Sequence, residues 1–178
     1  MTLRNLAAAL DRVAGVLRRR PEMGLQGDAP ATARWQGGTR IVTVHANGTQ
    51  VTSDMPAELG GAGDAVTPGW LFRAALASCA ATSIAMIAAA EGIELGALEV
   101  RAESRSDTRG LLGMVDAHGQ PVDSGPRDLE LQVRIAARNV APERLRVLVQ
   151  NGLRRSPIPS LVQQATPVRL RIDVEETT

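Results

Sequence analysis

The stretch Thr67–Gly92, TPGWLFRAALASCAATSIAMIAAAEG, decides the fold of this chain. Thr67 is a good N-cap residue, Pro68 suits the first helical position, and Gly92 is a natural stop. The residues between them are apolar on nearly every side, and Arg73 is their only charge before the final turn. The pattern predicts a helix of about six turns. Because such a helix has no polar face, we expect it to be buried.

A lone cysteine, Cys79, lies halfway along this predicted helix. It has two interpretations. Free cysteine is among the most buried residue types, so Cys79 could be a small apolar core residue. Alternatively, a nearby cation could make it a reactive thiolate. A single cysteine excludes an intramolecular disulfide and a CxxC metal site.

Length and composition limit the number of domains and the kinds of partner that we expect for this chain. The chain has 178 residues, which predicts one domain with a terminal extension. Its net charge is +1, and only three residues are aromatic, so we expect no nucleic-acid partner. His45 and His118 are isolated from other ligands, so we expect no metal and no other cofactor. Polar residues interrupt the apolar segment and no signal-peptide core is found, so we expect a cytoplasmic protein with no membrane partner.

The N-terminal residues predict a separate element. Residues 2–19 place leucine and valine on one helical stripe with arginines off it, which indicates an amphipathic helix. Packing against the body or a second subunit is the favoured role, and a membrane-surface or transit segment is the alternative. Residues 21–31 are a linker rich in glycine, proline and alanine. Residues 1–31 therefore form an extension, and 32–178 form the main domain.

Strands are expected over residues 32–53. Asn47-Gly48 is a strong hairpin signal between 41–46 and 49–53, and it would place Val42, Val44 and Val51 on one face. The glycine-rich run 58–63 lacks a phosphate-binding pattern and is expected to be a flexible loop.

The second half of the chain alternates between strand and helix signals. The expected elements are strands at 98–103, 129–135 and 168–174, loops or a short hairpin over 105–127, a helix from Pro142 to about Ser156, and a short helix at 160–164. Alternating strands favour antiparallel sheets with one solvated face. The predicted fold class is therefore α+β, with helices packed on sheets.

Four motifs resemble the OsmC/Ohr family of osmotically inducible and organic hydroperoxide resistance proteins. They are DMPAELGGAG at 54–63, TPGWLFRAALASC at 67–79, GIEL at 92–95 and RSPI at 155–158. The resemblance covers roughly residues 32–175. It implies an intertwined homodimer in which antiparallel sheets enclose two long central helices.

The resemblance also implies a chemistry. The best-known members of the family are thiol peroxidases, in which a thiolate at the position of Cys79 attacks the peroxide. An arginine from an early strand keeps the sulfur ionised, a glutamate in a Pro-Glu pair orients the arginine, and a second cysteine closes a disulfide. The thiolate is required because the neutral thiol is a poor nucleophile.

This sequence departs from that set. Gly69 stands at the position of the glutamate, and Ser156 at that of the second cysteine. Arg34 and Arg40 both lie on plausible early strands, and Arg34 is favoured because it precedes the Gly37-Gly38 interruption.

Other polar residues are weaker candidates. Arg73, His45 and Glu58 could each approach the site, but interface or surface roles are favoured for them. Cys79, Arg34 and Ser156 are therefore the candidate site residues.

Two functions remain open. One is a one-cysteine reductase of organic hydroperoxides in the oxidative stress response, recycled by an external thiol. The other is a non-catalytic homodimer with a degenerate peroxidase site that keeps the fold and has a structural role or binds a small apolar ligand.

Overall fold

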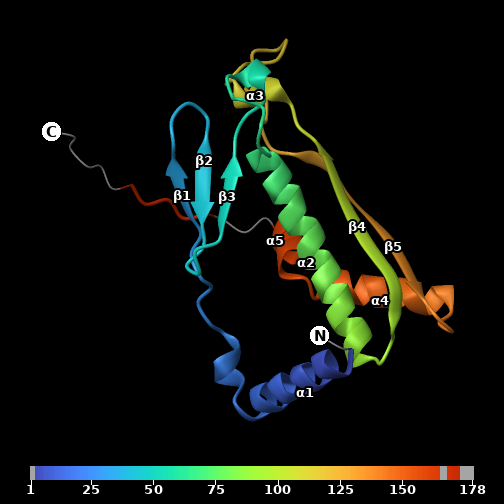
Figure 1. Cartoon of the computed structure of the whole chain (residues 1–178). Helices are drawn as coiled ribbons and strands as arrows, with labels where there is room; N and C mark the ends of the chain where they lie inside the picture. The colour runs from blue at the N-terminus through green and yellow to red at the C-terminus, as the bar shows by residue number, and fades with distance from the viewer. Residues whose placement is uncertain (1–2, 165–167, 173–178) are drawn as a thin grey trace.

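The computed structural model describes residues 3–164 and 168–172. Figure 1 shows one long central helix, α2, with two separate antiparallel sheets. This arrangement confirms the predicted α+β class. In chain order the elements are α1 (Leu3–Arg19), a 3-10 turn (Pro21–Gly24), β1 (Thr32–Trp35), β2 (Ile41–Val44), β3 (Gln50–Ser53), a 3-10 turn (Ala57–Leu59), α2 (Pro68–Ala90), β4 (Leu95–Arg105), α3 (Thr108–Leu111), β5 (Arg127–Ala137), α4 (Pro142–Arg154) and α5 (Pro157–Gln164).

Helix α2 begins and ends where the sequence predicts. The Thr67 hydroxyl accepts the backbone N–H of Trp70 at 3.2 Å and satisfies one of the free donors of the first turn. At the other end Gly92 has a φ of +68°, which glycine adopts without strain and which turns the chain into β4. The helix contacts β4, α4, α5 and α1, so it joins most of the molecule.

The core lies between α2, α4 and the β4–β5 sheet. Ile84, Ile87, Ala88 and Leu148 form its buried cluster, and side chains from β4 and β5 pack against them. The two helices approach closely at Gly152, where an added Cβ would lie 2.5 Å from Ile84 Cγ1 and 3.0 Å from Ile84 Cα. Only a residue without a side chain fits this contact.

The first sheet has the order β1-β2-β3 and the second pairs β4 with β5. The expected hairpin forms, but its register differs from the prediction: Val51 pairs with Thr43, and so faces away from Val42 and Val44. The physical reason is loop length. The His45 N–H donates to Thr49 O, leaving a three-residue loop rather than the two-residue turn that Asn-Gly suggested. One extra residue moves every following side chain to the opposite face.

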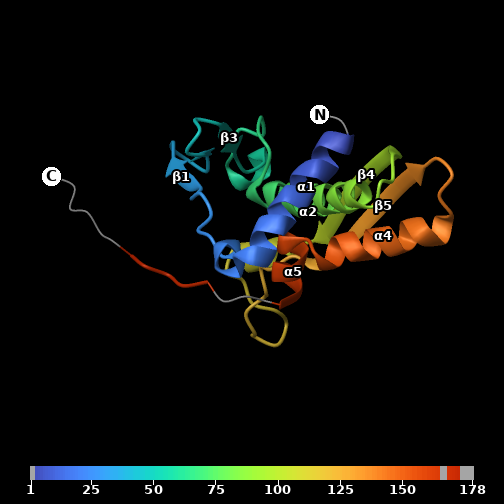
Figure 2. The same cartoon turned by 90° about the horizontal axis from the view of Figure 1, so that it is seen from below.

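The predicted last strand is not present in its described part. Residues 168–172 form no helix and pair with no strand, while 173–174 lie outside the described residues. Val168, Leu170 and Ile172 are 94%, 77% and 73% exposed. Figures 1 and 2 show this red segment extending away from the helices. A strand needs a neighbour for its backbone hydrogen bonds, and the single chain offers none here.

Much of α2 is uncovered within the single chain. By length and composition α2 could cross a membrane, but the core helix of a globular protein meets the same criteria. In α2, 33% of the 18-residue window tested is buried. Figure 2 shows α1 crossing α2 and α4 running beside β5. Even so, Trp70, Ser78, Thr82 and Met86, which recur along one side of α2, stay exposed.

The contact at Gly152 gives a first prediction. Gly152→Ala should destabilise the fold by about 1–3 kcal/mol, because its methyl group would clash with the Ile84 backbone and side chain. At this chain length each kcal/mol lowers Tm by about 2–4 °C, which thermal unfolding followed by circular dichroism can measure.

The matched control is Gly15→Ala in α1, where the nearest atom to an added Cβ is Arg19 Nη1 at 3.6 Å. That change should be neutral or raise stability by up to about 1 kcal/mol, since alanine favours helix more than glycine does. If both variants unfold at the same temperature, the close helix contact is not what constrains Gly152.

Candidate active site at Cys79

Two of the three candidate residues lie together. The Ser156 hydroxyl donates a hydrogen bond to Cys79 Sγ, with an oxygen-to-sulfur distance of 3.1 Å. Ser156 is fully buried, while Cys79 is half-buried. Cys79 lies in the middle of α2, and Ser156 lies between α4 and α5, so residues 77 positions apart in sequence meet at one point.

The local sequence explains why the serine hydroxyl is available. Ser156 occupies the N-cap position of α5, since its carbonyl accepts the N–H of Ser160. A capping serine usually bonds the N–H of the third helical residue, but here that residue is Pro159, which has none. Pro157, at the first position, lacks an N–H as well. The hydroxyl therefore points to Cys79 instead of to its own helix.

Arg34 is not joined to this pair. It lies on β1 with its side chain exposed, beside a surface hollow also lined by Val44 and His45. In the part of the chain that the structure describes, its side chain makes no hydrogen bond or ion pair, with Cys79 or with any other residue.

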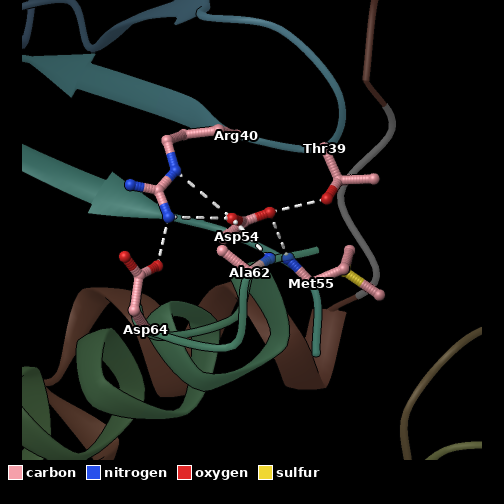
Figure 3. A network of polar contacts seen from close by, with 6 residues as sticks. All are labelled: Thr39, Arg40, Asp54, Met55, Ala62 and Asp64. Atoms are coloured by element: carbon pink, nitrogen blue, oxygen red, sulfur yellow. Dashed lines mark hydrogen bonds and ion pairs between the residues drawn. The ribbon is translucent and has the colours of Figure 1, made fainter. Parts of the chain in front are cut away.

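Arg40 is engaged elsewhere. Figure 3 shows its guanidinium bound to two carboxylates, those of Asp54 and Asp64. Its Nε and Nη2 lie 3.2 Å and 3.1 Å from Asp54 Oδ2. The hydrogen bonds that the guanidinium donates to Asp54 and then to Asp64 raise the pKa of Arg40 above its ordinary value. The two arginines that sequence analysis left open thus have different surroundings, and neither contacts the sulfur.

Asp54 is the centre of this network, and sequence analysis did not single it out as a site residue. It is 3% exposed and accepts hydrogen bonds from the Thr39 hydroxyl at 2.6 Å and from the N–H groups of Met55 and Ala62. These bonds, that of Thr39 first, lower the pKa of Asp54 to about 2. The carboxylate is therefore charged at neutral pH and ties the end of β3 to β2 and to the following loop.

The same network corrects the prediction of a flexible glycine-rich loop over 58–63. The run is a compact turn, with Gly60 in the left-handed region at φ +83°. An added Cβ on Gly61 would lie 1.7 Å from Met55 O, so the backbone packs against itself there. Together with the Ala62 bond to Asp54, this contact holds the loop that leads into α2.

Gly69 and Arg73 meet at the start of α2. An added Cβ on Gly69 would lie 3.8 Å from Arg73 Nη1, and that same nitrogen donates to Ser104 Oγ at 3.3 Å. A carboxylate placed at position 69 would therefore meet Arg73 first. Of the weaker candidates, His45 accepts the N–H of Asn47 through Nδ1 on the hairpin, and Glu58 is exposed.

No metal site is evident in residues 3–164 and 168–172, where no group of three or more histidine, cysteine, aspartate or glutamate side chains could hold an ion. What the site offers is thiol chemistry: a half-buried sulfur with one hydroxyl donor.

A family profile described as OsmC-like protein matches residues 61–171, more than half of the 178 residues. A search of curated proteins gives no match.

Solved structures share the fold. The chain is similar to an OsmC-like protein of Mycoplasma pneumoniae, with 17% identity over 78% of this chain and 89% of that one, and a TM-score of 0.63. It is also similar to an organic hydroperoxide resistance protein of Legionella pneumophila, at 22% identity, 78% and 91% coverage, and a TM-score of 0.52. A third structure, an organic hydroperoxide resistance protein of Elizabethkingia anophelis with thiocyanate bound, has 21% identity, 78% and 90% coverage, and a TM-score of 0.53.

The Asp54 network gives a prediction with a defined pH dependence. Its folded-state pKa of about 2 lies below the ordinary value of 3.8, so the ionised carboxylate stabilises the fold above about pH 4. That contribution is lost as the pH falls through 2. Asp54→Asn should lower Tm by several degrees at pH 7, and the difference from wild type should shrink between pH 4 and pH 2. Thermal unfolding across this range measures both effects.

Asp28→Asn, a change of the same chemistry in the exposed linker, is the control and should leave Tm unchanged. A Tm difference between wild type and Asp54→Asn that stays constant from pH 7 to pH 2 would contradict the role given to the carboxylate.

Proposed function

The chain belongs to the OsmC-like protein family, and from that premise we propose that Cys79 reduces organic hydroperoxides by a one-cysteine mechanism in the response to oxidative stress. The observation that carries the proposal is the hydrogen bond from the buried Ser156 hydroxyl to Cys79 Sγ. This contact holds the sulfur in a fixed position, which orients it for attack on a bound peroxide. The nucleophile is thus held in place by a residue that cannot itself be oxidised.

The proposed reaction uses a single thiol of the protein, that of Cys79. The Cys79 thiolate attacks the outer peroxide oxygen, the O–O bond breaks, and the alkoxide leaves and takes up a proton to become the alcohol. Cys79 is then a sulfenic acid. An external thiol attacks its sulfur, releases water and forms a mixed disulfide. A second thiol releases Cys79 and leaves as the oxidised disulfide. One hydroperoxide and two thiols thereby give one alcohol, one water and one disulfide. A cytoplasmic location, which supplies such thiols, fits this cycle.

The second candidate function is a homodimer that binds a small apolar ligand without turnover. The specific observation in its favour is that neither Arg34 nor Arg40 contacts Cys79 in the single chain, while Gly69 carries no carboxylate. The sulfur then lacks the neighbouring cation that activates reactive cysteines. The two functions differ in whether Cys79 turns over.

The kinetics of peroxide reduction distinguish the two candidate functions. Stopped-flow mixing with cumene hydroperoxide should show a slow reaction that is abolished in Cys79→Ser. Ser156→Ala should lower the rate by roughly tenfold, the size expected for losing one hydrogen bond to a charged group. Wild type should give a sulfenic acid by mass spectrometry. Absence of any reaction that depends on Cys79 would favour the binding function.

Ser156→Cys is the complementary variant. Because the side-chain oxygen of residue 156 already lies 3.1 Å from Cys79 Sγ, a sulfur there needs little movement to reach a bond length of about 2.05 Å. Peroxide should convert this variant, but not wild type, to an internal disulfide. A variant that folds and stays reduced under excess peroxide would show that the two positions are not aligned for exchange.

The uncovered surfaces support the proposal of a homodimer. Trp70, Ser78, Thr82 and Met86 of α2 are exposed, and the β1–β3 sheet stands beside the helices in Figure 1. Residues 168–172 present three exposed apolar side chains without a neighbouring strand. A second copy would bury all three surfaces at once. Exposed apolar patches of this extent mark interfaces.

We therefore expect a dimeric mass by light scattering at micromolar concentration, with a buried area above about 2,000 Å². Deleting residues 168–178 should weaken the dimer, since it removes the unpaired segment. A monomer at micromolar concentration would reject the proposal.

A further inference from the structure

A cavity of about 810 Å³ opens at the start of α2, separate from the Cys79–Ser156 pair. It lies between the loop that leads into α2, the segment around α3, and α5. Its walls are largely apolar, and its main apolar contributors are Met55, Leu59, Phe72, Leu111, Leu129 and Val162. A cavity of this volume is in the range that holds small-molecule ligands.

Arg73 gives the cavity its charge. It is half-buried, and it is the only lysine or arginine among the described residues that line the cavity. Its one side-chain hydrogen bond goes to the neutral Ser104 hydroxyl, and no carboxylate pairs with it in the described part of the chain. A half-buried guanidinium without a counter-ion is costly, and a ligand carboxylate would satisfy it with two parallel hydrogen bonds.

Asp107, the one acidic residue among the described lining residues, does not compete for that role. Asp107 is bound by its neighbour Arg109, whose Nε and Nη2 lie 3.0 Å and 2.6 Å from the two carboxylate oxygens. This pairing, above all the hydrogen bond from the Arg109 side chain, lowers the pKa of Asp107 to about 2. Its charge is therefore compensated outside the cavity, while that of Arg73 is not.

Gly69 leaves the guanidinium open. Both residues line the cavity, and the missing side chain of Gly69 would have started 3.8 Å from Arg73 Nη1. Any longer residue at position 69 would fill the space in front of the guanidinium, and an acidic one would neutralise it.

We infer that this cavity binds an anionic amphiphile, a carboxylate with an unbranched apolar tail, whose head group pairs with Arg73 and whose tail lies along Phe72 and Leu129. The inference does not rest on the proposed peroxide reaction, because Cys79 is not among the lining residues. The head group supplies the missing counter-ion, and the tail covers apolar side chains that water would otherwise contact.

Isothermal titration of the full chain with decanoate, below its micelle concentration, tests the inference. Decyltrimethylammonium, which has the same tail length and the opposite charge, is the ligand control. We expect binding of decanoate and much weaker binding of the cation. Arg73→Met should weaken decanoate binding at least about tenfold, since hydrogen bonds to charged groups are worth that much or more. Arg73→Lys should recover part of the loss.

Two further variants complete the design. Gly69→Glu should abolish decanoate binding by placing a carboxylate against Arg73, and an acidic residue in the first turn is compatible with the helix. Arg134→Met, in the separate groove between β5 and α4, removes the same charge elsewhere and should leave binding unchanged.

The inference is overturned if decanoate and the cation bind equally, if Arg73→Met and Arg134→Met have the same effect, or if no decanoate binds. The titration is repeated on Cys79→Ser, which should bind decanoate like wild type. Decanoate binding without peroxide reduction would reject the proposed reaction alone, and peroxide reduction without decanoate binding would reject this inference alone.

Discussion

The close approach of α2 and α4 at Gly152 is the contact on which the rest of the site depends. Ile84 is completely buried against it, and Leu148, one turn earlier on α4, is completely buried as well. Because α4 ends at Arg154, the position of its last turn sets where Ser156 lies, only two residues later. The hydroxyl reaches Cys79 because a glycine lets the helices approach, so core packing and the candidate chemistry share one constraint.

Pro157 and Pro159, on either side of Ile158, then determine which group the Ser156 hydroxyl binds. A serine before a helix ordinarily caps it, and the segment Ser156–Ser160 would be expected to behave in that way. With Pro157 and Pro159 removing two of the first three N–H donors, the helix has little need of the hydroxyl. The same prolines stop α4 and start α5, so one short motif ends a helix, turns the chain and directs a polar group to sulfur.

Sequence analysis predicted the elements whose signals are local. Helix α2 follows from its cap, its composition and its terminal glycine, and the pairing of β2 with β3 follows from Asn47-Gly48. The errors arose where the structure depends on groups that are distant in sequence or that the single chain lacks. The face of Val51 depends on a three-residue loop, and the compactness of 58–63 depends on Asp54 accepting the N–H of Ala62. Neither interaction produces a periodicity in the sequence from which it could be predicted.

The proximity of Cys79 and Ser156 is likewise a contact that local sequence signals do not predict. Their separation of 77 residues carries no local signal, and only the family resemblance suggested that they meet. The choice between Arg34 and Arg40 had no such guide, because Arg34 lies on β1, Arg40 directly precedes β2, and the decisive facts are the carboxylates around Arg40.

The distribution of arginines bears on how the sulfur can be activated. Arg40 is neutralised by two aspartates, Arg73 faces a cavity at the start of α2, and Arg34 has an exposed side chain on the first sheet. Within one chain, the described polar group that touches Cys79 is therefore a neutral hydroxyl. A hydroxyl can orient a thiolate and share its charge, but it cannot supply the Coulombic stabilisation of a cation. If the sulfur does gain a cation, it has to come from a surface that a single chain leaves open, and Arg34 is the one of the three arginines that has no partner among the described residues.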